Sequence, residues 1–220
     1  MNIAIDGPAG AGKSTVAKLV AKQLGYLYID TGSMYRALAW AAFAHQVPID
    51  DEKAVYELLM KNRITLQRDG ETQRIFWNDQ DITDSIRTPQ VSQYASVVAS
   101  YALVRQQMLV LQREMAKGGN VVMDGRDIGT HVLPEADVKI FLTASIRKRA
   151  ERRLQELLQK GHQTDLASLE AEIAERDKRD MEREVAPLRQ AEDAVLIDTS
   201  ELTIPQVVDE ILQICKQLGE

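Results

Sequence analysis

Short apolar runs alternate with segments of helical periodicity along most of this chain. The first apolar run is followed by apolar positions at the spacing of a helix, which Gly25 ends. Apolar runs typical of strands occupy residues 2–6, 26–30, 120–124, 138–142 and 194–198. Helical patterns occupy residues 13–24, 33–46, 88–117, roughly 165–184 and 203–218, with further helices from Asp50 or Asp51 and from about Ser145. Strands that alternate with helices in this way predict an α/β fold with a five-stranded parallel sheet flanked by helices.

Residues 63–87 interrupt this order with alternating apolar and polar positions. The alternation continues on both sides of Asp69–Gly70, a dipeptide that favours a hairpin turn, and Asn78–Asp79 indicates a second turn. We therefore expect a small antiparallel sheet inserted into the α/β core.

Length and charge limit the kind of protein this can be. A chain of 220 residues, 45% of them hydrophobic, can bury a sizeable core, and we expect a single domain over residues 1–220. The net charge of -6 argues against a nucleic-acid polymer or an anionic membrane as a partner. The sequence shows neither a coiled-coil pattern nor an apolar stripe that would indicate association with a second copy of the chain, so we expect a monomer.

Cysteine usage bears on the compartment. Cys215 is the single cysteine, so an internal disulfide is impossible and a reducing environment is indicated. The opening residues lack the pattern of a signal peptide, and no apolar run approaches the length that spans a membrane. We expect a cytoplasmic protein.

The segment GPAGAGKS, Gly7 to Ser14, matches the phosphate-loop pattern G-x-x-x-x-G-K-[ST] between a predicted strand and a predicted helix. Backbone N–H groups must converge on phosphate oxygens in such a loop, and Gly7, Gly10 and Gly12 keep it free of Cβ atoms and allow positive φ. The N-terminus of the following helix adds partial positive charge. We expect Lys13 to bridge the β- and γ-phosphates of a nucleoside triphosphate and the Ser14 hydroxyl to bind Mg²⁺. The alternative, a glycine-rich turn without a ligand, is disfavoured by the Lys-Ser pair and by the strand–helix context.

Several classes of protein can use a bound triphosphate. A switch GTPase needs D-x-x-G and N-K-x-D motifs, and the chain contains neither. A kinase of small molecules needs a second anion-binding site that faces the phosphate loop (P-loop). A P-loop protein that binds nucleotide for regulation or assembly is a further alternative.

One candidate for the second site is the loop IDTGSMYRA, residues 29–37, which follows a strand and therefore opens at the same sheet edge as the P-loop. Asp30 or Thr31 can cap the next helix. Beside a P-loop, Arg36 on that helix is a plausible anchor for a phosphate group.

Another candidate is the loop VVMDGRDIGTHVLPEAD, residues 121–137, which gathers three charged residues at the end of a strand. Asp124 occupies the position at which P-loop enzymes keep a carboxylate associated with Mg²⁺. Gly125 lets the chain turn, so that Arg126 and Asp127 can enter the cleft. Structural ion pairing is the alternative for these charges, but their position at the carboxyl end of a strand favours function.

The segments GPAGAGKS, DTGSMYR, MDGRDIGT and ERDKRDMEREVAPL, in this order, resemble the bacterial cytidylate kinases, a family of nucleoside monophosphate kinases. The similarity extends from the first strand to the last helix and includes the inserted antiparallel sheet. It implies that the γ-phosphoryl group of ATP is transferred to CMP or dCMP with the help of Mg²⁺. It also implies a monophosphate-binding insert over about 31–100 and a helical lid over about 149–184. The runner-up is a kinase of the same fold that acts on another monophosphate, such as UMP.

The resemblance assigns roles to residues by position. On the acceptor side it implies Arg36, Arg126 and Arg183 for the phosphate, Ser96, Arg105 and Asp127 for cytosine, Arg176 and Asp180 for the ribose, and Thr31 and Tyr35 for the pocket wall. On the donor side it implies Gly7, Gly10, Gly12, Lys13, Ser14, Thr15, Arg149, Arg153 and Arg179, with Ser14 and Asp124 for the metal. The residues expected to act in catalysis are Lys13, Arg126, Arg153 and Arg183.

The lid has its own pattern. Arg176, Asp180 and Arg183 recur at i, i+4 and i+7, which puts them on one face of a helix. Without a P-loop, this segment would be a solvated helix with ion pairs such as Glu175–Arg179. The resemblance implies instead a mobile segment that closes over the phosphates and excludes water.

The expected chemistry needs no covalent enzyme intermediate and no strong general base, because the acceptor phosphate is already anionic. Lys13, Mg²⁺ and the lid arginines would align the reactants and spread the charge of an in-line transfer. For Arg149 and Arg153 the alternative is a basic face on a surface helix.

Overall fold

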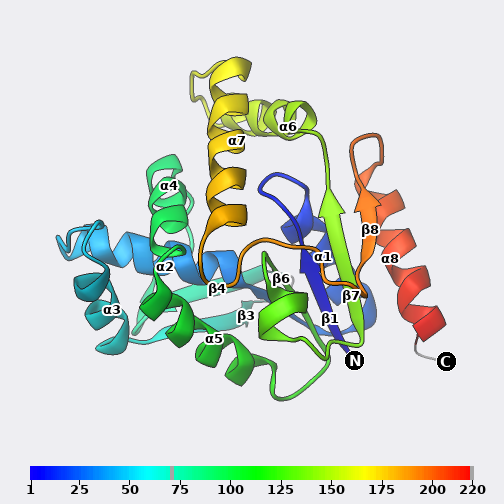
Figure 1. Ribbon diagram of the computed structural model, residues 1–220, viewed down its shortest axis with the longest axis horizontal. Coiled ribbons are helices and arrows are strands. Elements are labelled where there is room, and N and C mark those ends of the chain that lie inside the picture. The colour runs from blue at the N-terminus through cyan, green and yellow to red at the C-terminus, as the bar shows by residue number, and fades with distance from the viewer. Residues whose placement is uncertain (70–71, 219–220) are drawn as a thin grey trace. The chain divides into compact units, whose positions relative to one another are not determined.

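The predicted apolar strands form one parallel sheet in the computed structural model, which describes residues 1–69 and 72–218 (Figure 1). The strand order is β2-β6-β1-β7-β8. The strands are β1 (Asn2–Asp6), β2 (Leu27–Asp30), β6 (Val121–Gly125), β7 (Val138–Thr143) and β8 (Val195–Asp198). The five-stranded parallel sheet expected from the sequence is confirmed.

Strand β1 lies at the centre of this sheet, since it pairs in parallel with β6 on one side and with β7 on the other. Ile3, Ala4 and Ile5 are completely buried, which explains why the strand is continuously apolar. Asp6 at the end of β1 is in register with Gly125 at the end of β6. The P-loop and the loop after β6 therefore leave the sheet at the same edge.

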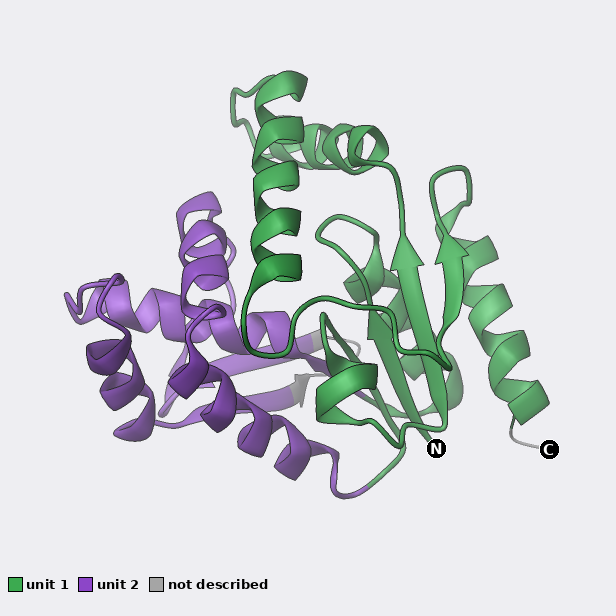
Figure 2. Ribbon diagram, viewed as in Figure 1, with its two compact units in different colours: residues 1–27, 119–220 green, residues 28–118 purple. Residues whose placement is uncertain are grey.

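The chain divides into two compact units, shown in Figure 2. Unit 1 contains residues 1–27 and 119–220, and unit 2 contains residues 28–118, so the division falls within β2. The single domain over 1–220, the insert over 31–100 and the lid over 149–184 stay predictions.

The helices of unit 1 cover the sheet and extend beyond it. They are α1 (Lys13–Leu24), the π-helix η1 (Ile128–Val132), α6 (Ile146–Gln159), α7 (Leu166–Glu182) and α8 (Ile204–Leu218). Helix α1 packs against β6 and α8, and α8 also contacts β7. Helices α6 and α7 pack together around Ala150, Leu157, Leu169 and Ile173. The two helices predicted from the lid sequence are thus present, and they share a small apolar core of their own.

Unit 2 contains the remaining elements. They are α2 (Thr31–Ala44), α3 (Glu52–Met60), β3 (Ile64–Asp69), β4 (Thr72–Trp77), β5 (Gln80–Asp81), α4 (Pro89–Val98) and α5 (Ala102–Ala116). Its core includes the completely buried side chains of Met34, Leu38, Val55 and Met108. Helix α2 packs against α4 and β4 at this core.

The antiparallel sheet expected over residues 63–87 is confirmed as the order β3-β4-β5. Strands β3 and β4 pair from Ile64 with Trp77 to Asp69 with Thr72. Gly70, at which the first turn is expected, lies outside the described residues. Trp77 pairs with Gln80, which leaves Asn78–Asp79 as the second turn, and Asn78 has φ 54°.

The prediction of continuous helix over 88–117 is wrong at its centre, because α4 ends at Val98 and α5 begins at Ala102. Tyr101 has an extended backbone, and its hydroxyl donates a 2.7 Å hydrogen bond to the Ile49 carbonyl. The Ala99 carbonyl accepts a 3.1 Å bond from Nη1 of Arg105. These side-chain partners stabilise a break that apolar periodicity cannot reveal.

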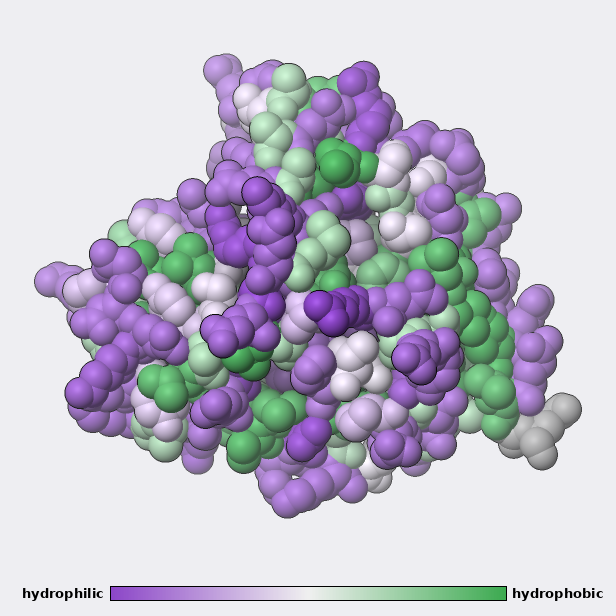
Figure 3. Space-filling view, in the orientation of Figure 1, coloured by the Kyte–Doolittle hydropathy of each residue, from purple (hydrophilic) through white to green (hydrophobic). Residues whose placement is uncertain are grey.

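Hydrophilic residues cover most of the face seen in Figure 3, with smaller hydrophobic areas between them. Among the described residues, none of the helices combines the length and the apolar character that crossing a membrane would require.

Candidate active site

The P-loop between β1 and α1 has the backbone that its glycines predict. Gly7, Gly10 and Gly12 all have positive φ, at 144°, 78° and 90°. A Cβ atom at Gly7 would lie 1.9 Å from the Leu142 carbonyl oxygen, so any larger residue would displace β7 or the loop. Gly12 is the N-cap residue of α1, so the N-terminus of α1 begins directly at the loop. The loop has the shape and the local dipole of an anion-binding site.

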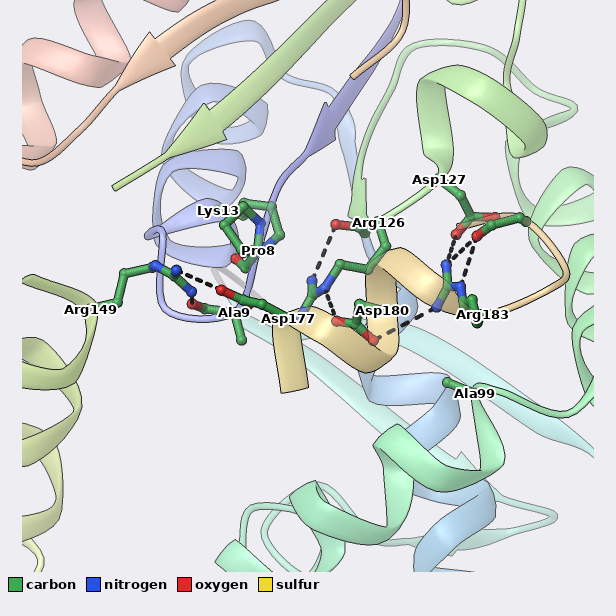
Figure 4. Close-up of polar contacts among 12 residues, drawn as sticks. Pro8, Ala9, Lys13, Ala99, Arg126, Asp127, Arg149, Asp177, Asp180 and Arg183 are labelled. Carbon is green, nitrogen blue, oxygen red and sulfur yellow. Dashed lines mark hydrogen bonds and ion pairs between the residues drawn. The ribbon is translucent and has the colours of Figure 1, made fainter. Parts of the chain in front are cut away.

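Lys13, the P-loop lysine, is 5% exposed. Its ammonium donates a 2.7 Å hydrogen bond to the Pro8 carbonyl, which fixes the side chain within the loop (Figure 4). Burial lowers the pKa of Lys13 well below its ordinary value, and the nearby charge of Arg126 lowers it further. A phosphate group beside Lys13 would offset both effects, so the lysine is suited to an anionic ligand.

Ser14 and Asp124, the two residues expected at the metal, lie together. The Ser14 hydroxyl donates a 2.8 Å hydrogen bond to Oδ2 of Asp124 at the carboxyl end of β6. A hydroxyl and a carboxylate are hard oxygen ligands of the kind that Mg²⁺ uses when it keeps several waters and binds substrate phosphates. No group of three or more His, Cys, Asp or Glu side chains placed to hold a metal ion occurs among the described residues. The hydroxyl and the carboxylate are chemically suited to a magnesium ion that would also be bound by a nucleotide.

Asp180 of α7 lies among three arginines in unit 1, of which Figure 4 shows Arg126 and Arg183. It is 5% exposed, and its Oδ2 accepts a 2.9 Å hydrogen bond from Nε of Arg126. Burial alone would raise the pKa of Asp180, but the positive charges of Arg126, Arg176 and Arg183 outweigh burial and lower it. The sequence expects all four residues on the acceptor side, and the structure brings them together. The guanidinium groups of this cluster offer charged N–H donors of the kind that bind an anionic ligand.

Arg183 follows the end of α7 and turns back into this cluster. Its Nε and Nη2 donate to the Ala186 carbonyl at 2.8 and 2.6 Å, and Nη2 also lies 3.3 Å from Oδ1 of Asp127. Ala186 has φ 49°, a conformation unusual for alanine, so this turn is strained where it holds the guanidinium. Asp127, expected to bind cytosine, here forms an ion pair with Arg183.

In unit 2, Asp30 organises the start of α2. Its Oδ1 accepts a 2.9 Å bond from the Ser33 backbone N–H, which is the helix cap expected from the sequence, and its Oδ2 lies 2.8 Å from Nη2 of Arg36. The cap also explains why α2 begins at Thr31, two residues earlier than predicted. Gln73 of β4 donates to the Tyr28 carbonyl and accepts from the Asp30 N–H, so the inserted sheet supports this loop.

The other expected acceptor residues of unit 2 are buried polar side chains. Arg105 of α5 lies over the Tyr35 ring, with its Cζ atom 5.7 Å from the ring centroid. Tyr35, Thr31, Ser96 and Arg105 are all less than a tenth exposed. This cation–π contact helps to hold the guanidinium group of Arg105 in place.

A P-loop, a hydroxyl–carboxylate pair and a buried arginine cluster in one unit are features suited to phosphoryl transfer, and comparison with known proteins gives the family. Residues 3–217 match the family model of cytidylate kinase. The chain is 54% identical over 217 residues to a cytidylate kinase of Bacillus cytotoxicus, covering 99% of this chain and 96% of that protein. It is also 54% identical over 217 residues to a cytidylate kinase of a Geobacillus species, with 99% and 97% covered.

The chain belongs to the cytidylate kinase family. The resemblance carried by the four sequence segments is thereby confirmed.

Solved structures agree on the fold of this family member. A shikimate kinase from Bacteroides thetaiotaomicron superimposes with a TM-score of 0.51 at 16% identity, covering 98% of each chain. A shikimate kinase from Acinetobacter baumannii, solved with shikimate, gives 0.50 at 15% identity and covers 98% of this chain and 93% of that chain. At such identities the likeness establishes the fold alone, that of P-loop kinases.

The lid arginines of this cytidylate kinase family member have different surroundings. Arg153 and Arg179 are about one-third exposed and pair with glutamates of their own helices, Arg179 with Glu175 as the sequence predicts. Arg149 is 4% exposed and donates to three protein acceptors, so the surface-face alternative is wrong for it. Thr15, beside Ser14, is exposed at the start of α1.

Two buried carboxylates of the site were not predicted. Asp6 at the end of β1 accepts backbone hydrogen bonds from Ile128 at 2.8 Å and Gly129 at 2.7 Å, and burial raises its pKa to about 7. Asp177 of α7 pairs with Arg149. Asp6 could have been found as a charge that ends a fully apolar strand. Asp177 lies three residues before Asp180, on the same side of the helix. In a segment with so many charged residues, the sequence did not distinguish it from its neighbours.

Proposed function

We propose that this chain transfers the γ-phosphoryl group of ATP to the phosphate of CMP or dCMP, which gives ADP and CDP or dCDP. The observation that carries the proposal is the proximity of the P-loop lysine to the arginines around Asp180. The charges of Arg126 and Arg176 act directly on the pKa of Lys13. A donor phosphate at Lys13 and an acceptor phosphate at these arginines would therefore occupy one continuous positively charged region of unit 1.

The reaction breaks the bond between the γ-phosphorus and the oxygen that bridges it to the β-phosphorus. The new bond comes from an oxygen of the monophosphate, which is already anionic and needs no general base. The P-loop N–H groups and Lys13 bind the donor phosphates, and Arg126 and Arg183 hold the acceptor phosphate in line. Catalysis is thus alignment and charge neutralisation.

Ser14 and Asp124 would hold Mg²⁺ in this proposal, with the β- and γ-phosphates as further ligands. Bound there, the ion would neutralise charge that develops on the phosphate oxygens. The 2.8 Å contact between Ser14 and Asp124 supports this assignment because it places two suitable oxygen ligands side by side.

The remaining roles follow the family resemblance. Arg36 would assist at the acceptor phosphate, and Ser96, Arg105 and Asp127 would bind cytosine. Arg176 and Asp180 would bind the ribose, and Thr31 and Tyr35 would line the pocket. Arg153 and Arg179, which are partly exposed, would act on the donor side when the lid excludes water. We propose that the chain works as a monomer in the cytoplasm.

A coupled assay of ADP release, with ATP, Mg²⁺ and a panel of CMP, dCMP, UMP, AMP and GMP, tests the function. We expect turnover with CMP and dCMP to exceed that with every other monophosphate, and we expect Lys13→Ala to remove it. Preferred turnover of UMP would overturn the assignment of the base. Tight ATP binding without turnover of any monophosphate would favour a regulatory P-loop protein.

A further inference from the structure

Arg149 of α6 lies against the P-loop through both its stem and its guanidinium group. A Cβ atom at Gly10 would be 3.1 Å from the Cβ of Arg149. The aliphatic part of the Arg149 side chain therefore packs closely against this glycine, and a larger residue at position 10 would crowd it. Nη1 donates a 3.0 Å hydrogen bond to the Ala9 carbonyl, and Nε donates a 2.9 Å bond to the Ala144 carbonyl. Arg149 thus joins the P-loop backbone to the chain just beyond β7.

The third partner of Arg149 is Asp177 of α7. Its Oδ2 accepts a 2.6 Å hydrogen bond from Nη2, as Figure 4 shows, and both side chains are less than a tenth exposed. The other carboxylate oxygen, Oδ1, is buried and has no hydrogen-bond partner among the described residues. A buried ion pair with an unsatisfied oxygen contributes little to stability compared with an apolar pair of similar volume. The ion pair is therefore better explained by where it holds the Arg149 guanidinium group than by a gain in stability.

Asp177 and Asp180 connect α7 to two different parts of the site. Asp177 connects the helix to the P-loop through Arg149, and Asp180 connects it to the loop after β6 through Arg126. We infer that Asp177 is a positioning residue for the donor site: through Arg149 it holds the P-loop backbone at Ala9 in its phosphate-binding shape and couples that shape to the lid helix. The inference concerns the donor side and rests on the proposed function only for its kinetic readout.

The test compares Asp177→Asn with the wild type. Asparagine keeps the shape but removes the charge that orients Arg149, and hydrogen bonds between charged groups are about twice as strong as neutral ones. We expect the KM for ATP to rise roughly tenfold, in line with the loss of one charge-assisted bond. The KM for CMP should not rise, because removing a negative charge near Arg126 does not weaken an anion site. Calorimetry with a non-hydrolysable ATP analogue should give the same loss of affinity without any turnover.

Glu170→Gln is the matched control. Glu170 of α7 pairs with Arg147 of α6 at 3.3 Å, so it joins the same two helices, but the pair is 32% and 64% exposed and does not include the P-loop. We expect this variant to bind the ATP analogue like the wild type. Equal losses in Glu170→Gln and Asp177→Asn would mean that helix association alone matters, and would overturn the inference.

Two further variants keep the test decisive. Arg149→Lys retains the charge, but a single ammonium cannot reach three separated acceptors, so it should reproduce the loss even where Asp177→Asn fails to fold. The double variant should lose no more affinity than the larger single loss, because Asp177 acts through Arg149. Additive losses, or unchanged analogue binding in folded Asp177→Asn, would overturn the inference. Analogue binding also separates this outcome from a failure of the proposed function, which would appear as a wild type that binds ATP but does not phosphorylate CMP.

Discussion

The Ser14 hydroxyl donates a 2.8 Å hydrogen bond to the Asp124 carboxylate, although 110 residues separate the two along the chain. The contact exists because β1 and β6 are neighbours in parallel register, so that the P-loop and the end of β6 meet at one edge of the sheet. The two oxygen atoms that meet at this sheet edge support the proposed Mg²⁺ site.

Asp124→Asn should therefore weaken the response to Mg²⁺. An amide oxygen is a poorer ligand than a carboxylate, so we expect half-maximal activity to need roughly tenfold or more Mg²⁺. Titration of activity with Mg²⁺ at fixed ATP measures this shift. Asp193→Asn is a suitable control, because this exposed carboxylate pairs with Lys139. Full wild-type activity in the presence of a chelator would contradict the metal assignment.

Lys13→Ala should fold like the wild type and lose most of its turnover. The ammonium is buried beside the P-loop carbonyl of Pro8, and charge-stabilising groups in such positions contribute about 3–4 kcal/mol to catalysis, or roughly 10²–10³ in kcat. Steady-state kinetics at saturating ATP and Mg²⁺ gives the value. Lys22→Ala, an exposed lysine in the last turn of the same helix, is the control. Near-normal kcat in Lys13→Ala would exclude the proposed mechanism.

Asp6 makes the free energy of unfolding depend on pH, and the burial of its carboxyl group fixes the direction of this dependence. Burial raises the pKa of Asp6 from an ordinary 3.8 to about 7 in the folded protein. Between these pH values the unfolded chain has lost the proton and the folded chain still holds it. The contribution of Asp6 to the free energy of unfolding is therefore most favourable at low pH and falls as the pH rises towards 7.

Asp6→Asn should remove this component. The variant loses an acceptor for one of the Ile128 and Gly129 N–H groups, so its absolute stability will differ from that of the wild type. Between about pH 5 and about pH 8, however, its free energy of unfolding should fall less than that of the wild type. Urea unfolding at both pH values measures the difference. The same pH dependence in both proteins would mean that other groups account for it.

The sequence predicts the P-loop accurately because a local motif specifies a local backbone. Gly7 and Gly12 need positive φ regardless of what lies around them, and the following helix begins where the pattern places it. The strands were predictable for a similar reason, since β1 is buried on both faces and must be apolar throughout. Arg36 and Arg126 were candidates because of their loops, whereas the acceptor role of Arg183 came from the family resemblance.

Long-range partners were not predictable in this way. The break between α4 and α5 depends on Tyr101 reaching the Ile49 carbonyl, a contact that no periodicity encodes. For Arg149 the sequence left two interpretations, a donor-side residue and part of a basic face on a surface helix, and only the fold brings Asp177 and the P-loop carbonyl to it. In each case a polar side chain meets a partner far away in sequence, and local pattern cannot identify that partner.

The choice of base tests the role of Asp127. Cytosine presents an exocyclic amine where uracil presents an oxygen, so a carboxylate favours cytosine, and such contacts discriminate by about 1–3 kcal/mol. Asp127→Asn adds a donor that can face the uracil oxygen. If Asp127 binds the base, the ratio of kcat/KM for CMP to that for UMP should fall by roughly tenfold or more.

The ion pair between Asp127 and Arg183, at 3.3 Å, gives a second way for the same variant to act. If Asp127 serves only to orient Arg183, Asp127→Asn should weaken CMP and UMP equally, since both carry the phosphate that Arg183 is proposed to bind. Arg183→Ala supplies the reference for such a uniform loss, because it removes the guanidinium and leaves the carboxylate. An unchanged CMP-to-UMP ratio in Asp127→Asn, with the pattern of loss seen in Arg183→Ala, would assign Asp127 to the arginine rather than to the base.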